Sequence, residues 1–164
     1  MPSSSQVSCG DVSEAETYLT EAKTVAHELG DEHTVALLDR ALADIDTDHG
    51  QWRSATRRLD RTLRFNLAHN DRDNEAETLQ SMGHLAAIQS EPEQARELFD
   101  RVLQIRRELG QPVEVARALA RLQWAHQATG EQGKAEECRD GWRAIVDDFG
   151  LDDGCLRLPS HLRG

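Results

Sequence analysis

The chain repeats itself with a period of forty residues. One series of positions at this spacing holds only alanine: Ala15, Ala55, Ala95 and Ala135. A second series holds the two residue types that best tolerate the left-handed conformation at the end of a helix: Gly30, Asn70, Gly110 and Gly150. A fixed period between about 20 and 50 residues is the signature of a chain that stacks copies of one supersecondary unit.

Each unit contains two stretches with helical periodicity. Leu79, Met82 and Ala86 recur on one helix face, and Val102 and Ile105 do so in the next stretch. No useful length alternates with period two, so the predicted fold class is all-α. Seven helices are expected, near 12–29, 32–48, 51–68, 73–89, 92–109, 113–129 and 132–149.

The period also predicts the domain organisation. We expect a flexible N-terminal segment at 1–11, a repeat domain at 12–150, and a tail or short cap at 151–164, with unit boundaries near 30, 70, 110 and 150. Ser90 and Glu93 have the spacing of a capping box, and Pro92 suits a first helical turn. Ser90 is therefore predicted to cap the start of the fifth helix.

The third unit resembles a tetratricopeptide repeat. Seven residues carry the resemblance: Leu79, Met82, Gly83, Ala86, Ala95, Phe99 and Val102. Gly83 and Ala95 are small residues where paired helices touch, and Phe99 fills the space between them. The resemblance covers about residues 12–150. Its period matches the long-repeat variety found in bacterial regulator sensor arrays and in kinesin light chain. It implies a right-handed superhelix of antiparallel helix hairpins, with about three and a half repeats.

Two units depart from this pattern. Gln123 stands where the fourth unit should have glycine, and Arg139 stands where it should have phenylalanine. In the second unit, Asp39 and Asp46 occupy positions that are normally large. These departures leave the helix hairpins expected and the packing within them open.

The resemblance implies that the first helix of each pair lines a concave surface holding a peptide or a partner helix. Carried over by position, the candidate lining comprises Arg40, Asp44, Glu77, Gln80, His84, Arg117, Trp124 and Gln127, with Leu37 and Ile88 beside them. Trp124 is either an affinity anchor in this groove or a core residue packed on a neighbouring helix.

The charge argues against some partners. A formal net charge of −11 and a pI near 5.0 disfavour nucleic acid and anionic membranes, which need a basic footprint. A stripe of arginines nevertheless follows one helix: Arg53, Arg57, Arg61 and Arg64, with Arg58 beside it. It either contacts phosphates or acidic peptides, or balances the aspartates of the preceding helix. We favour the second interpretation.

No catalytic or metal-binding motif is complete. The stretch DIDTDHGQW, residues 44–52, begins like a calcium loop but has His49 and Ala55 at the sixth and twelfth positions, where glycine and glutamate are required. It is interpreted as a hairpin turn, with Gly50 at its end. In HELGDEH, His27 and His33 are six residues apart, whereas a zinc helix needs four. We therefore expect no enzyme activity, no metal and no cofactor.

Three widely spaced cysteines, no leader sequence and no long apolar run predict reduced thiols and a cytoplasmic location. The expected function is a non-catalytic scaffold that binds a protein or peptide segment in a bacterial regulatory context. One alternative is a signalling-peptide sensor fragment of a transcriptional regulator, and another is an accessory subunit of an enzyme. The first helix lacks a hairpin partner and should expose Tyr18, Leu19 and Val25. This edge suggests a homodimer.

Overall fold

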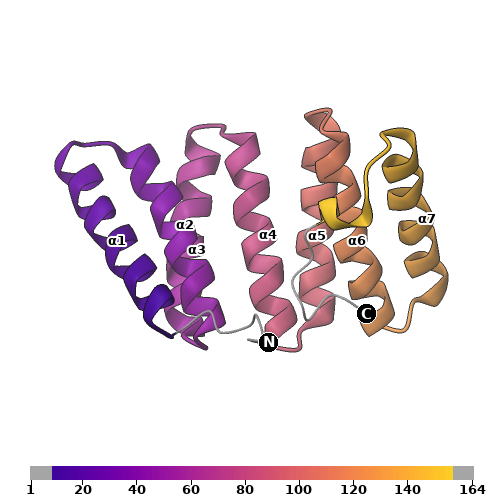
Figure 1. Cartoon of the computed structure of the whole chain (residues 1–164), viewed down its shortest axis with the longest axis horizontal. Coiled ribbons are helices and arrows are strands. Elements are labelled where there is room, and N and C mark those ends of the chain that lie inside the picture. Colours follow the sequence, from indigo (N-terminus) through magenta and orange to yellow (C-terminus); the bar gives the residue numbers. More distant parts are fainter. Residues whose placement is uncertain (1–8, 157–164) are drawn as a thin grey trace, which may run out of the picture. The chain divides into compact units, whose positions relative to one another are not determined.

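The computed structural model describes residues 9–156, which form seven α-helices and one short 3-10 helix (Figure 1). Their bounds are α1 (Cys9–Glu28), α2 (Glu32–Asp48), α3 (Trp52–Ala68), α4 (Arg72–Ile88), α5 (Pro92–Glu108), α6 (Pro112–Ala128), α7 (Gln132–Asp148) and η1 (Asp153–Leu156). The described part of the chain contains no strand. The predicted all-α fold with seven helices is confirmed. Only the start of α1 differs by more than a residue, since Cys9–Asp11 were expected to be flexible. Residues 1–8 of that predicted segment lie outside the described residues.

Every connection between α-helices uses a left-handed residue. These residues are Gly30, Gly50, Asn70, Ser90, Gly110 and Gly130, and Gly150 takes the same conformation after α7. At Gly50 the amide donates to the Thr47 carbonyl at 3.1 Å, and the Gln51 amide donates to the Asp46 carbonyl at 2.7 Å. This pair of hydrogen bonds is the Schellman arrangement, which satisfies carbonyls left open at a helix end. Residues 44–52 are therefore a helix end and a hairpin turn, as the sequence indicated.

The predicted cap at Ser90 is wrong. Ser90 has φ of 61° and ends α4, while Glu91 occupies the N-cap of α5 and makes no side-chain capping bond. The forty-residue register explains the difference, because Ser90 stands at the position that Gly50 and Gly130 fill in the neighbouring hairpins. The need for a left-handed residue there outweighed the capping-box spacing.

The helices fall into two compact structural units, the first unit and the second unit, which are larger than the forty-residue repeats and divide between His69 and Asn70. The first contains α1, α2 and α3, and the second contains α4 to α7 with η1. Consecutive helices within each unit run antiparallel (Figure 1). In the second unit, η1 packs on α6 and buries Leu156. Residues 157–164 of the predicted tail lie outside the described part.

The core of the second unit shows why the third repeat has its pattern. Ala95 and Phe99 are fully buried on α5, and Phe99 lies directly over Gly83 of α4. A β-carbon at Gly83 would stand 2.5 Å from the Phe99 ring, so only glycine leaves room for it. The packing roles expected for Gly83 and Phe99 are confirmed, and Ala95 is buried.

The α6–α7 hairpin packs differently from the α4–α5 hairpin at the equivalent positions. Trp142 of α7 is 8% exposed and donates its indole N–H to the Gln123 side-chain carbonyl at 2.7 Å. Gln123 thus supplies the acceptor that a buried indole requires. Arg139 points to Asp140 at 3.2 Å instead of filling the core. In the fourth repeat, Gln123 at the Gly83 position therefore hydrogen-bonds Trp142, which stands at the Val102 position, and Arg139 at the Phe99 position stays out of the core.

No helix in residues 9–156 has the length and apolar character needed to cross a membrane.

Candidate partner-binding faces

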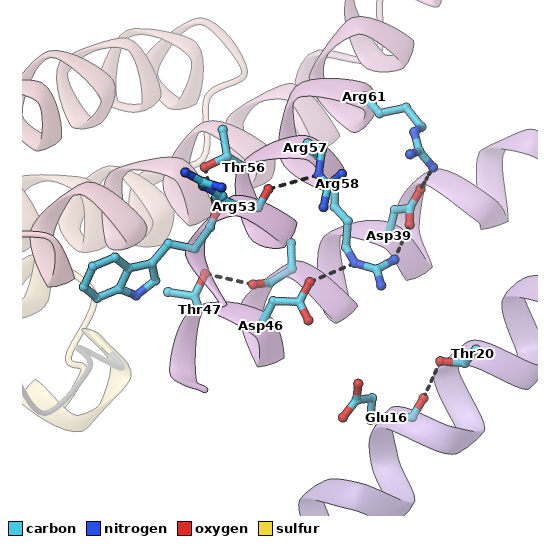
Figure 2. Close-up of polar contacts among 12 residues, drawn as sticks. Glu16, Thr20, Asp39, Asp46, Thr47, Arg53, Thr56, Arg57, Arg58 and Arg61 are labelled. Carbon is cyan, nitrogen blue, oxygen red and sulfur yellow. Dashed lines mark hydrogen bonds and ion pairs between the residues drawn. The ribbon is translucent and has the colours of Figure 1, made fainter. Parts of the chain in front are cut away.

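The first unit contains a buried carboxylate shared by three cations. Asp39 of α2 is 1% exposed and accepts from Lys23 of α1 at 2.6 Å. It also accepts from Arg58 of α3 at 3.0 Å (Figure 2). Arg61 donates to its other oxygen at 3.2 Å. Arg58 also donates to Asp46 at 2.9 Å. Burial of this kind needs pairing and hydrogen bonding, and both are present.

This cluster supports the favoured interpretation of the arginine-rich helix for two of its five arginines. Arg58 and Arg61 balance the aspartates of α2, which is the interpretation favoured from the sequence. Opposite charges raise the pKa of Arg58 against the lowering effect of its burial. Arg53, Arg57 and Arg64 are exposed on α3. The side chains of Arg57 and Arg64 donate to backbone carbonyls one turn earlier, at 3.4 and 3.2 Å.

A hollow of about 450 Å³ lies in the first unit between α1 and the other two helices. Its lining includes Lys23, His27, Leu42 and Arg58. The Lys23 ammonium and the Arg58 guanidinium are both engaged by Asp39, so neither of these two charges is available to a ligand without breaking that cluster.

The predicted concave residues are divided between the two units. Arg40 and Asp44 lie half-buried on α2 of the first unit. The other six lie in the second unit, on α4 and α6: Glu77, Gln80, His84, Arg117, Trp124 and Gln127. Gln127 is exposed and the other five are half-buried. Trp124 is thus partly packed and partly accessible to solvent.

The second unit contains its own buried ionic cluster, centred on an arginine that sequence reasoning missed. Arg106 of α5 is 2% exposed and donates to Asp73 at 2.5 Å and to Glu77. It also donates to the Gln111 side chain at 2.7 Å. Arg106 therefore holds α4 and the start of α6 together. The signal was weak, because its equivalents Ala26, Asn66 and Val146 are not basic.

Beside this cluster lies a second buried guanidinium. Arg121 of α6 is 6% exposed and donates to the backbone carbonyl of Arg117 at 3.1 Å. The neighbouring Glu114 is engaged by Arg117. Among the described residues, no carboxylate lies within ion-pair distance of Arg121. Its four-residue spacing from Arg117 places both residues on one helix stripe, but no sequence signal distinguishes the buried Arg121 from the half-buried Arg117.

Burial lowers the pKa of Arg121 to about 10. The more distant charges of Glu114 and Glu77 oppose this effect, and those of Arg117 and Arg106 add to it. Arg121 therefore stays charged at neutral pH while being poorly solvated. A perturbed, desolvated charge of this kind is a candidate functional group, because an anion arriving from outside would stabilise it.

The cysteine and the possible metal ligands in the described residues do not form a reactive site. Burial raises the pKa of the Cys138 thiol, aided by the nearby charges of Asp100 and Glu137, so this sulfur is not activated as a thiolate. Within the described part of the chain, no three His, Cys, Asp or Glu side chains are grouped so that they could hold a metal ion.

Comparisons with known proteins support the fold. No protein family model and no curated protein matches the chain. Among solved structures, it is similar to BtubC (BKLC) from P. vanneervenii, with a TM-score of 0.78 and 21% sequence identity. The similarity covers 86% of this chain and 59% of BtubC, so the chain spans less than two thirds of that neighbour's length. At this identity the likeness establishes a helical repeat fold.

Proposed function

We propose that the chain is a non-catalytic scaffold of the tetratricopeptide type, and that its second unit binds a protein or peptide segment carrying an acidic group. Arg121 is the single observation that carries this proposal. It is desolvated, charged and engaged only by a backbone carbonyl among the described hydrogen-bonding groups. A guanidinium in this state favours a carboxylate, which it can contact through two parallel hydrogen bonds.

The surroundings of Arg121 support a peptide as ligand. Arg117 lies one turn before it on α6, and half-buried Trp124 lies three residues after it. An aromatic side chain beside a desolvated arginine is a composition typical of binding hot spots. The six predicted residues of α4 and α6 would supply the contacts around this centre.

A matched pair of peptides tests the proposal directly. Peptides of about twelve residues that differ only in a central Asp or Asn are screened for binding to the full chain by fluorescence anisotropy. We expect a preference for Asp that is lost in Arg121→Met. The control Arg64→Met removes an exposed arginine of the first unit and should keep the preference. Asp and Asn peptides that bind equally well would contradict the proposal.

A pull-down from the source cell then addresses the regulatory context. The wild-type chain should recover a partner that Arg121→Met and the double variant Arg117→Ala/Trp124→Ala lose. If all three chains recover the same partners equally, this face is not the binding surface. The identity of the partner distinguishes a regulator from an accessory subunit of an enzyme.

A further inference from the structure

Helix α1 presents an apolar stripe to solvent. Tyr18 is 67% exposed, Val25 is 53% exposed and Leu29 is 77% exposed. Ala15 and Ala22 lie on the same stripe and are also exposed. The spacing of three and four residues along this series is that of one helix face. Contiguous exposed apolar groups of this kind mark an interaction surface.

The forty-residue register identifies what this stripe normally contacts. Tyr18, Ala22 and Val25 correspond to Leu98, Val102 and Ile105 of α5, which are 8%, 1% and 3% exposed. Helix α5 packs on α4 before it and on α6 after it. Helix α1 already has α2 after it, and that contact leaves the stripe open. The stripe is therefore the face that receives the preceding helix of a hairpin.

Acidic side chains border the stripe along one edge. Glu14, Glu21 and Glu28 recur every seven residues and are all exposed. Among the described residues, none of the three has an ion-pair partner. Seven residues are two helical turns, so these carboxylates line the same side of the stripe.

In the α2–α3 and α4–α5 hairpins, charged residues at positions equivalent to Glu21 or Glu28 lie close to charged residues of the preceding helix. Glu28 corresponds to Glu108 of α5, which pairs with Arg72 of α4 at 2.5 Å. Glu21 corresponds to Arg101, which lies 3.9 Å from Glu75 of α4. In α3 the equivalent of Glu21 is Arg61, which pairs with Asp39 of α2. In both hairpins, a charge at the Glu21 position faces an opposite charge on the preceding helix.

We propose that the exposed face of α1 binds, antiparallel, an amphipathic helix of another protein that carries two basic residues three positions apart in its first turn. The first basic residue would meet Glu28, as Arg72 meets Glu108. The second would meet Glu21, in the place where Glu75 meets Arg101. The apolar stripe of that helix would cover Tyr18.

The same charges disfavour a second copy of this chain. Two α1 helices packed antiparallel through their stripes would place the Glu14–Glu28 edges against each other, which is repulsive. The first helices of the three hairpins in this chain, α2, α4 and α6, do not match α1 either, because none of them has basic residues at both positions that would face Glu28 and Glu21. At the two first-turn positions they carry Glu32 and Val35, Arg72 and Glu75, and Pro112 and Val115. The homodimer suggested by the sequence is thus the less favourable way to cover α1.

Two peptides derived from residues 71–90 test the proposal against the full chain. The basic peptide carries Glu75→Arg and keeps Arg72, while the acidic peptide carries Arg72→Glu and keeps Glu75. Both share the apolar face of α4, so they differ only in the two edge charges. We expect the basic peptide to bind about tenfold more tightly at low salt, with the preference shrinking as salt is added.

Charge reversal on α1 supplies the matched control. The variant Glu21→Lys/Glu28→Lys should prefer the acidic peptide. The variant Asp147→Lys/Asp148→Lys makes the same change in net charge at exposed positions on α7 and should behave as wild type. The proposal is overturned if neither peptide binds at about 1 mM, or if Glu21→Lys/Glu28→Lys leaves the order unchanged. It is also overturned by a dimer in sedimentation equilibrium that Tyr18→Asp dissociates.

Discussion

The aromatic ring of Phe99 occupies the space that a side chain at Gly83 would need, with its nearest ring carbon 2.5 Å from the site of the missing β-carbon. This contact joins α4 and α5 within the core of the second unit, and both residues are buried. Gly83, one of the residues that carry the repeat signature, must therefore stay small for Phe99 to pack, and this requirement can be measured.

Gly83→Ala should therefore destabilise the protein, even though alanine is the better helix former. We expect a loss of about 1–3 kcal/mol in the free energy of unfolding, because Phe99 has to move within a packed core. Urea unfolding followed by circular dichroism measures it. Gly133→Ala is the control, since nothing lies within 4 Å of a β-carbon there and α7 is helical at that point. That control should be neutral or stabilising by up to about 1 kcal/mol, and equal losses in both variants would contradict the packing argument.

Asp39→Ala should destabilise the first unit by about 2–4 kcal/mol. It leaves Arg58 and Lys23 partly buried without their shared carboxylate, which is the costly way to break a buried ion pair. Chemical denaturation compares it with Asp100→Ala, an exposed aspartate of α5 that should change stability by no more than about 0.5 kcal/mol.

The same cluster predicts a rescue. In the α4–α5 hairpin, the positions of Asp39, Asp46 and Arg58 hold Leu79, Ala86 and Leu98. The triple variant Asp39→Leu/Asp46→Ala/Arg58→Leu should unfold within about 1 kcal/mol of wild type or be more stable, because apolar packing replaces both buried carboxylates and Arg58, while Lys23 and Arg61 keep access to solvent. A triple variant as unstable as Asp39→Ala would show that the ionic network is needed for the fold itself.

Arg121→Met should make the isolated chain more stable by about 1 kcal/mol, since a desolvated charge is removed and one hydrogen bond to a carbonyl is lost. Thermal and urea unfolding of the two proteins, without added peptide, measure the change. A clear loss of stability would assign Arg121 a structural role and weaken the case for it as a ligand anchor.

Glu131 provides a pH-dependent prediction. Hydrogen bonds from Lys134 and His126 lower its pKa from 4.5 to about 2. A lowered folded-state pKa means that its contribution to stability is present above about pH 4.5 and is lost as the pH falls toward 2. Glu131→Gln should therefore lower the melting temperature at pH 7 and lose this effect near pH 2. Glu97→Gln, an exposed change of equal charge, should show no such dependence, and parallel pH profiles for the two variants would contradict the prediction.

The sequence alone determined the helices and their connections. The left-handed positions at Gly30, Asn70 and Gly110 are local requirements, and the apolar spacing of each helix is set by 3.6 residues per turn, so both can be read without tertiary contacts. The Ser90 error has the same origin, since two local signals competed and only the register could decide between them.

Tertiary structure decided what the polar residues do. Asp39 became a buried ion-pair centre only because α1 and α3 bring Lys23 and Arg58 to it from sixteen and nineteen residues away. Arg121 became a desolvated charge because of what packs around α6, which no spacing along one helix reveals. Burial and pairing depend on neighbours distant in sequence, and these determine whether a charge stabilises the fold or remains available for a ligand.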